Sequence, residues 1–336
     1  MTHEFKKIVE GFISDKKKGL KSVLATVVAL DGSSYRRPGV RMGISENGEL
    51  TGAVSGGCVE KEVVFQAASV FKTGSPKMMT YDGRFRLGCE GILYILLEPF
   101  DVDDQVLQQL KEALCKRTEF AIASHYKKEY GVCNGLGSIV VLKGARIPLR
   151  RNFNSGQETE LFSQEMKPIY KLVIIGGEHD AVKLSYLALG LGWEVVVATV
   201  PSEDKQLADF PGIDALWNVE PELLPVDEID AQTAVVLMTH SYVKDLKYLK
   251  ALKKAEPMYF GLLGPTKRRE KLFGEYMELY PEEDYDFFDA IYGPAGLNIG
   301  AEAPEEIAVA ILAEILTVIR KQEPMLLRDK KQGIHN

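Results

Sequence analysis

The stretch Leu172-Val173-Ile174-Ile175-Gly176-Gly177 decides the fold of the second half of the chain, because a continuous apolar run here ends in two glycines. Such a run, followed by a segment with helical periodicity, is typical of a buried parallel strand that leads into a helix. Three more apolar runs, separated by amphipathic segments, cover residues 193–198, 234–238 and 258–263. Buried strands that alternate with helices indicate a parallel sheet covered on both faces. We therefore predict a Rossmann-like, doubly wound parallel sheet over residues 168–325.

The turn after the first of these strands departs from the fingerprint that binds dinucleotides. The pattern Gly-x-Gly-x-x-Gly/Ala is met by Gly176 and Ala181, but Glu178 stands where a second glycine would let the backbone approach a pyrophosphate. The pair Ala198-Thr199 stands where an acidic side chain would bind the ribose. A carboxylate adds both bulk and repulsion beside a pyrophosphate. The sequence therefore favours the fold but argues against ordinary NAD(P) binding.

Other strand ends in this half carry polar and basic side chains. His240 follows the strand of residues 234–238, at the edge where open α/β sheets bind ligands. It is either a ligand contact or a hydrogen-bonded structural histidine. Lys267 and Arg268 follow a Gly-bounded turn at a predicted helix start, where free amides and positive charge suit a phosphate. The alternative for this basic cluster is a solvated charged face.

The first half of the chain mixes short strands with helices. Asn47-Gly48 lies between two apolar runs and signals a hairpin, and residues 5–15 and 59–71 have helical periodicity. Hairpins mixed with helices indicate an antiparallel or mixed sheet with helical cover. We expect three further parts of the chain: an N-terminal α+β domain with a mixed sheet over residues 1–142, a polar linker over 143–167 and a C-terminal tail over 326–336.

The segment from Asp31 to Glu60 contains the parts of a polyanion site with a reactive thiol. Its guanidinium groups can bind phosphate or carboxylate, and they belong to Arg36, Arg37 and Arg41. Ser55-Gly56-Gly57 can present a concave array of backbone amides to an oxyanion. Cys58 follows at or just before a predicted helix start, where the helix dipole favours the thiolate. The alternative is a tight turn in which Cys58 is a small buried apolar residue.

Composition limits the class of protein. The chain has 336 residues, enough for two domains that each bury a core. Its net charge of -7 argues against nucleic acid as a partner. Its four cysteines lack zinc-binding spacing, so no metal site is expected. The first residues lack the apolar run of a signal peptide and no stretch approaches a membrane span, so we expect a cytoplasmic protein with no membrane partner.

These motifs together resemble those of the XdhC/CoxI family, the accessory factors of xanthine dehydrogenase and related molybdenum hydroxylases. In the first half, the similar stretches are Gly32-Ser33-Ser34, Arg36-Arg37-Pro38-Gly39, Gly52-Ala53-Val54-Ser55-Gly56-Gly57-Cys58-Val59-Glu60 and Leu87-Gly88-Cys89. In the second half, they are Met238-Thr239-His240, Gly261-Leu262-Leu263-Gly264, Lys267-Arg268 and Gly296-Leu297. The stretches occur in the family's order and extend over both predicted domains.

The resemblance implies a chaperone for molybdenum cofactor, a phosphorylated pterin dithiolene that holds molybdenum. It implies that the cofactor is held while a cysteine desulfurase supplies sulfur, and is then delivered to the apo-enzyme of a molybdenum hydroxylase. Cys58 would contact the metal or receive sulfur, with Cys89 as a second thiol. The anionic part of the cofactor would be bound by Arg36, Arg37, Arg41, Ser55, Gly56, Gly57, Lys267 and Arg268, with His240 also at the site.

We also expect a homodimer. The alternative function is that of an NAD(P)-dependent oxidoreductase that uses the Rossmann-like domain, with His240 as its proton donor. Glu178 and the missing ribose-binding acid argue against this alternative.

Overall fold

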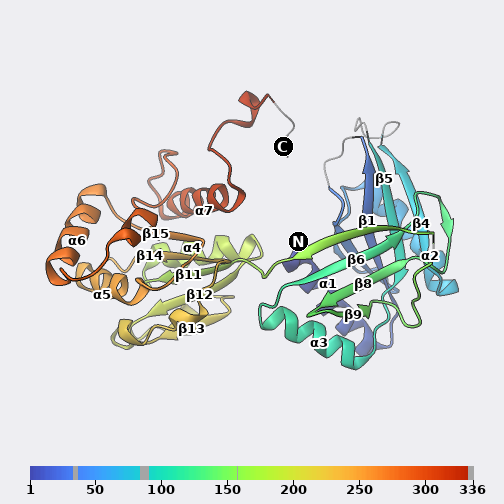
Figure 1. Ribbon diagram of the computed structural model, residues 1–336, viewed down its shortest axis with the longest axis horizontal. Coiled ribbons are helices and arrows are strands. Elements are labelled where there is room, and N and C mark those ends of the chain that lie inside the picture. Colours follow the sequence, from blue (N-terminus) through green and yellow to red (C-terminus); the bar gives the residue numbers. More distant parts are fainter. Residues whose placement is uncertain (33–36, 84–90, 157, 332–336) are drawn as a thin grey trace. The chain divides into compact units, whose positions relative to one another are not determined.

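The computed structural model describes the backbone of residues 1–32, 37–83, 91–156 and 158–331 (Figure 1). The chain forms two compact units, Met1–Pro168 and Ile169–Asn336. Each unit has its own sheets and its own buried core.

Two antiparallel sheets form the first unit. The larger has the strand order β3-β2-β1-β5-β4-β7 and the smaller β10-β6-β8-β9. The strands are β1 (Ser22–Asp31), β2 (Arg41–Ser45), β3 (Leu50–Gly52), β4 (Lys77–Asp82), β5 (Ile92–Pro99), β6 (Phe120–Tyr126), β7 (Gly131–Val132), β8 (Gly137–Leu142), β9 (Ala145–Pro148) and β10 (Glu160–Met166). Every strand pair recorded in these sheets is antiparallel. The predicted α+β class is confirmed, with antiparallel rather than mixed pairing in its sheets.

The helices α1 (Thr2–Lys18), α2 (Cys58–Thr73) and α3 (Asp104–Cys115) cover these sheets. α2 buries Val59, Val63 and Ala67 in a core that it shares with β1, β2, β4 and β5. Fully burying a valine side chain contributes roughly 1.5–3 kcal/mol. This face therefore fixes α2 along the larger sheet, and the predicted helix start at Cys58 is confirmed.

Residues 143–167, which we expected to form an irregular linker, instead contribute two strands to the first unit. β9 and β10 are the edge strands of the smaller sheet, and the boundary between the units follows Pro168. Most of β10 is exposed or half-buried, so its polar residues resemble a loop in the sequence. Pro148 closes β9, which is compatible with a strand at a sheet edge.

The second unit is built on a parallel sheet with the strand order β13-β12-β11-β14-β15-β16. Its strands are β11 (Lys171–Ile175), β12 (Glu194–Thr199), β13 (Ala215–Asn218), β14 (Thr233–Leu237), β15 (Tyr259–Leu262) and β16 (Ile291–Tyr292). Its helices are α4 (His179–Gly190), α5 (Tyr242–Leu252), α6 (Thr266–Leu279) and α7 (Pro304–Arg320). α4 and α7 share one buried core, whereas α5 and α6 share the other (Figure 1). The predicted doubly wound sheet is confirmed.

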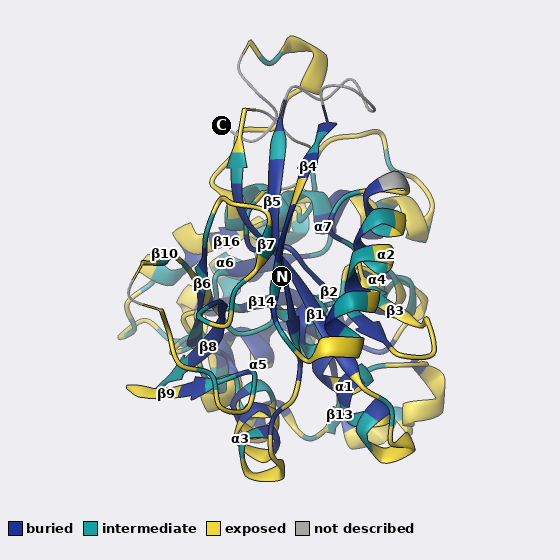
Figure 2. Cartoon of the chain, turned by 90° about the vertical axis from the view of Figure 1, so that its right-hand side faces the viewer, coloured by how far each residue is buried: buried dark blue, intermediate teal, exposed yellow. Residues whose placement is uncertain are grey.

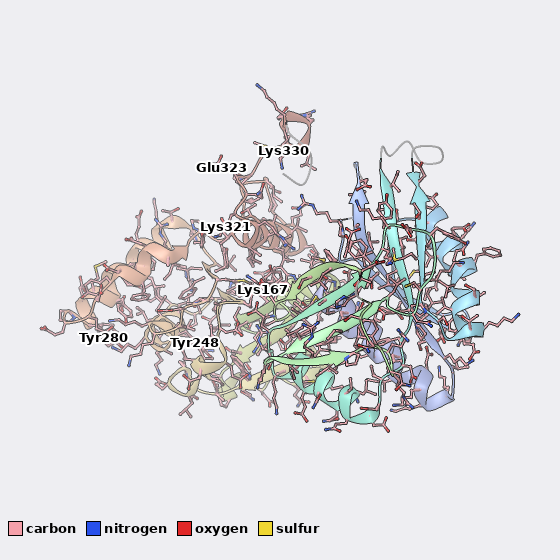
Figure 3. The ribbon with its side chains drawn as sticks, turned by 45° about the vertical axis from the view of Figure 1, so that its right-hand side comes forward. Lys167, Tyr248, Tyr280, Lys321, Glu323 and Lys330 are labelled. Carbon is pink, nitrogen blue, oxygen red and sulfur yellow. The ribbon has the colours of Figure 1, made fainter. Side chains whose placement is uncertain are left out.

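The inner strands β1, β5, β11 and β14 are largely buried, whereas the segment after α7 is largely exposed (Figure 2). Lys321, Glu323 and Lys330 mark that segment in Figure 3. Within the described ranges, no helix is both long and apolar enough to cross a membrane.

Candidate functional site

The turn before α2 has an open backbone. Gly57 is the N-cap residue of α2, with φ of 70° and ψ of -82°, and it precedes Cys58 in the first position of the helix. A Cβ added at Gly56 or at Gly57 would meet no heavy atom within 4 Å. The backbone of this turn therefore borders open space, and the first amides of α2 lie next to it. A helix N-terminus carries about half a positive charge, which favours a bound anion or a thiolate.

Glu60 fixes the shape of this turn. The backbone N–H of Ser55 donates to Glu60 Oε1 at 2.8 Å. Glu60 Oε2 is buried and has no hydrogen-bond partner among the described residues. The carboxylate thus ties the end of the preceding segment to the first turn of α2. We did not assign a role to Glu60 from the sequence. An acidic residue in the third helical position usually accepts from the amide of the N-cap residue, whereas Glu60 accepts from Ser55, two residues before the N-cap.

Arg41, predicted to bind an anion, is buried inside the first unit with 5% of its surface exposed. Its Nη1 donates to the Gly39 carbonyl at 3.0 Å and to Gln164 Oε1 on β10. Its guanidinium carbon lies 6.0 Å from the ring centroid of Phe5. Burial lowers the pKa of Arg41 to about 10, and the charge of Glu98 opposes this shift. Arg41 is therefore an interior side chain that holds the start of β2 against β10.

The other predicted residues of the first unit differ in how far the structure describes them. Arg37 is exposed, directly before the turn that leads to β2. Arg36, Cys89 and the side chain of Cys58 lie outside the described part of the chain.

In the second unit, His240 lies at the carboxyl end of β14, beside the point where the strand order reverses. Its Nε2 is 3.2 Å from Asp180 Oδ2, in the first turn of α4. His240 has φ of 56°, an uncommon conformation for a residue with a side chain. Its side chain is 48% exposed, so it lies close to a carboxylate and is still accessible to a ligand. Gly176, directly after β11, allows the backbone there to lie close to the end of β14, because a Cβ at this position would lie 2.5 Å from the carbonyl oxygen of Met238.

Arg268 is fixed in one orientation at the same edge of the sheet. Its Nη2 lies 2.6 Å from Oδ2 of Asp245, which is buried at 1% exposure. Oδ1 of Asp245 accepts a hydrogen bond from the Thr239 hydroxyl at 2.6 Å. Lys267, by contrast, is exposed and has no ion pair to a described residue. The structure therefore brings His240, Arg268 and Lys267 to the carboxyl edge of one sheet, and Lys267 has the freer charge.

A hollow of about 350 Å³ borders the start of α6. It is lined by residues 263–265, by residues 294–295 and 297–301, and by Ile307 and Ala310 of α7. Lys267 is two residues after Pro265 in the chain but does not line the hollow. Among the described residues, no group of three or more His, Cys, Asp or Glu side chains could hold a metal ion.

The fold and these sites define a class of protein in which an antiparallel α+β unit with a Gly-Gly-Cys helix start is followed by a Rossmann-like unit. The chain belongs to the XdhC and CoxI family, as its motifs predicted. The profile described as the XdhC and CoxI family matches residues 16–82, which include the turn before α2. The profile described as the XdhC Rossmann domain matches residues 172–315.

Relatives align over nearly the whole chain. A Bacillus subtilis (strain 168) protein, named as a probable subunit of xanthine dehydrogenase, is 28% identical over 331 residues, covering 93% of this chain and 96% of that protein. PaoD of Escherichia coli (strain K12), named a molybdenum cofactor insertion chaperone, is 24% identical over 330 residues, covering 96% and 91%. A crystal structure described as a xanthine dehydrogenase from Bacillus halodurans has a TM-score of 0.76 and 27% identity, covering 94% of this chain and 97% of that one.

Proposed function

We propose that this protein is an accessory factor that binds molybdenum cofactor as cargo, supports its sulfuration and delivers it to a molybdenum hydroxylase of the xanthine dehydrogenase type. The observation that carries the proposal is the open Gly56-Gly57 turn at the start of α2, in a chain that belongs to the XdhC and CoxI family. The relative PaoD, named for cofactor insertion, supports the same function.

The residues of the turn suit this cargo, which presents a phosphate, a pterin ring and a soft metal centre for recognition. The amides at Gly56 and Gly57 border open space, as an oxyanion site requires. Arg37 is exposed near the start of β2, and we propose that Arg36 and Arg37 bind the phosphate. Cys58 is the first residue of α2, where the helix dipole favours a thiolate, a soft ligand for a transition metal. We propose Cys58 as the metal contact or sulfur acceptor and Cys89 as a second thiol.

We assign Arg41 a supporting role rather than a direct contact, because its guanidinium is buried and bonded to Gly39 and Gln164. In the second unit, we propose Lys267 as the direct anion contact. The charge of Arg268 is paired with that of Asp245, so we propose that Arg268 contributes hydrogen-bond donors held in one orientation. His240 is the polar contact at the same edge. The partners we propose are the apo-hydroxylase, a cysteine desulfurase and a second copy of this chain.

The proposal is tested by purifying the protein and its Cys58→Ala variant from cells that make molybdenum cofactor, and measuring bound molybdopterin by the fluorescence of its oxidised pterin. We expect the variant to lose most of the bound cofactor, whereas Cys115→Ala, an exposed thiol at the end of α3, retains it. Equal, stoichiometric cofactor in all three proteins would remove Cys58 from the mechanism. No cofactor in any of them would contradict the proposed function itself.

The alternative is an NAD(P)-dependent oxidoreductase that uses the second unit. The strand order of this unit favours an oxidoreductase, because it reverses between β11 and β14, as in folds that bind dinucleotides. Against it, Glu178 is the N-cap residue of α4, and Thr199 rather than an acid closes β12. Titration with NADH and NADPH, followed by tryptophan fluorescence, separates the two functions. Micromolar binding would favour the oxidoreductase.

A further inference from the structure

A cavity of about 620 Å³ lies in the first unit, away from the turn at Cys58. It is lined by the last residues of α2, by the start of β1 and by the end of β5, and we call it the main chamber. α2 has 16 residues and is therefore about 24 Å long, with Cys58 at its opposite end. The main chamber is thus a separate place in the unit, and its volume is within the range of small-molecule sites.

The walls of the main chamber are apolar. Phe12, Val70 and Phe100 are buried side chains that line it, and Leu20 and Phe71 add partly buried apolar surface. These residues come from α1, from α2 and from the segments beside β1 and β5. A cavity with such walls binds the apolar body of a ligand by removing its surface from water.

The rim of the main chamber is positively charged. Five cationic residues line it, against the single acid Asp101: Lys16, Lys21, Lys72, Arg150 and Arg151. Lys16 lies 2.6 Å from Asp104, and Arg151 lies 3.2 Å from Asp101, so both are already paired. Arg150 donates to the carbonyl of Asn134 at 2.9 Å. The charge of the buried Glu98 also acts on Arg150. Among the cations of the rim, Lys21 and Lys72 are therefore the two whose ammonium groups have no carboxylate partner within the described ranges.

Lys21 and Lys72 lie at the same end of α2. Lys21 Nζ is 3.3 Å from the carbonyl oxygen of Phe71, the residue before Lys72. Glu46 Oε2 accepts a hydrogen bond from the backbone N–H of Lys21 at 3.1 Å. Within the described ranges, neither ammonium group forms an ion pair with a carboxylate. Lys21 also offsets the negative end of the α2 dipole, which would otherwise repel an anion. Two ammonium groups without a carboxylate partner, beside an apolar cavity, favour a ligand with one anionic group.

A smaller polar cavity of about 140 Å³ adjoins the main chamber, and the two share Phe12, Ser22 and Phe100. We call it the inner chamber. The Ser22 hydroxyl donates to Asp15 Oδ2 at 2.7 Å. Ser45 is 6% exposed, and its buried hydroxyl has no hydrogen-bond partner among the described residues. A buried hydroxyl without a partner costs free energy that a polar group of a ligand can recover.

We propose that the two chambers form a second ligand site, for a small organic anion with an apolar body and a hydroxyl group at its far end. The anionic group binds between Lys21 and Lys72, the body lies against Phe12 and Phe100, and the hydroxyl group reaches Ser45 in the inner chamber. This site is separate from the proposed cargo site, so either proposal can fail without the other.

The test uses the full chain and the fluorescent sulfonate 1-anilinonaphthalene-8-sulfonate, which has an apolar body and one negative charge. The double variant Lys21→Gln/Lys72→Gln should bind the dye about tenfold more weakly, because two charge contacts are lost. The matched control Lys18→Gln/Lys254→Gln makes the same change in net charge at exposed residues outside the chambers. Its affinity for the dye should stay within about twofold of that of the unmodified protein. Thermal melting of each variant confirms that it is folded.

Displacement of the dye then identifies the ligand class. Benzoate should displace it, whereas the neutral benzamide should not. 4-Hydroxybenzoate should compete better than benzoate, by about threefold or more, and Ser45→Ala should abolish that advantage. The proposal is overturned by unsaturable dye binding, by an equal loss in the control variant, by displacement with benzamide, or by an advantage of 4-hydroxybenzoate that survives in Ser45→Ala.

Discussion

Gly57 adopts a backbone conformation that would strain a residue with a side chain. Its φ of 70° lies in the region that glycine occupies freely, and no atom blocks an added Cβ. A side chain at position 57 is therefore disfavoured by the backbone conformation and not by a lack of space. This distinction can be tested, because the neighbouring Gly56 has the same open surroundings without a positive φ.

We predict that Gly57→Ala lowers the free energy of unfolding by about 1–2 kcal/mol, the cost of placing a Cβ at positive φ. Gly56→Ala should change it by less than about 0.5 kcal/mol. Urea denaturation of both variants measures the difference. If the two substitutions cost the same, strain at Gly57 does not fix the turn.

His125 makes the stability of the first unit depend on pH. Its Nδ1 is 3.2 Å from the Thr159 hydroxyl, and its buried Nε2 has no partner among the described residues. Burial, and then the charge of Arg146, lower the pKa of His125 below its ordinary value of 6.5. The unfolded chain therefore binds a proton more readily than the folded one, and stability is lost as the pH falls through 6.5 towards the folded pKa.

We predict that His125→Gln removes part of the loss of stability between pH 7 and pH 5.5. The effect should stay below about 1 kcal/mol, because the ring is only partly buried and solvent screens it. Urea denaturation at both pH values measures it. An identical loss in the variant and the unmodified protein would show that the titration of His125 does not contribute.

Among the helices and strands, the sequence predicts those whose own residues carry a clear hydrophobic pattern. β11 is a run of apolar residues and α2 repeats them at helical spacing, so both were predicted close to their positions. β9 and β10 were missed, because edge strands keep polar residues and resemble a loop. The burial of Arg41 was missed for a different reason. Its acceptor, Gln164, is 123 residues away, and one sequence gives no sign of such a contact.

β10 supports the start of β2 through this contact, and we predict that removing it is costly. Gln164→Ala takes away one acceptor of a buried guanidinium and should lower the free energy of unfolding by about 1–3 kcal/mol. Ser163→Ala, an exposed neighbour on the same strand, should cost less than about 0.5 kcal/mol. Guanidinium chloride denaturation compares them, and equal effects would mean that Arg41 does not depend on β10.

At the scale of the whole molecule, the boundary between the units determines which fragments fold. The sequence placed the end of the first domain at residue 142, whereas the compact unit ends at Pro168. Residues 143–168 supply both edge strands of the smaller sheet. They also supply three buried side chains of the core under α1 and α3, which belong to Ile147, Leu149 and Met166.

We predict that a fragment of residues 1–168 unfolds in one cooperative transition and that a fragment of residues 1–142 does not fold. Each buried aliphatic side chain contributes roughly 1.5–3 kcal/mol, so the loss of three removes about 5–9 kcal/mol. A domain has only about 5–15 kcal/mol of stability in total, and the shorter fragment also leaves Arg41 without Gln164. Thermal melting followed by circular dichroism distinguishes the fragments, with residues 169–331 as the matching fragment of the second unit. If residues 1–142 melt cooperatively at the same temperature as residues 1–168, the two edge strands are dispensable and the earlier boundary is the right one.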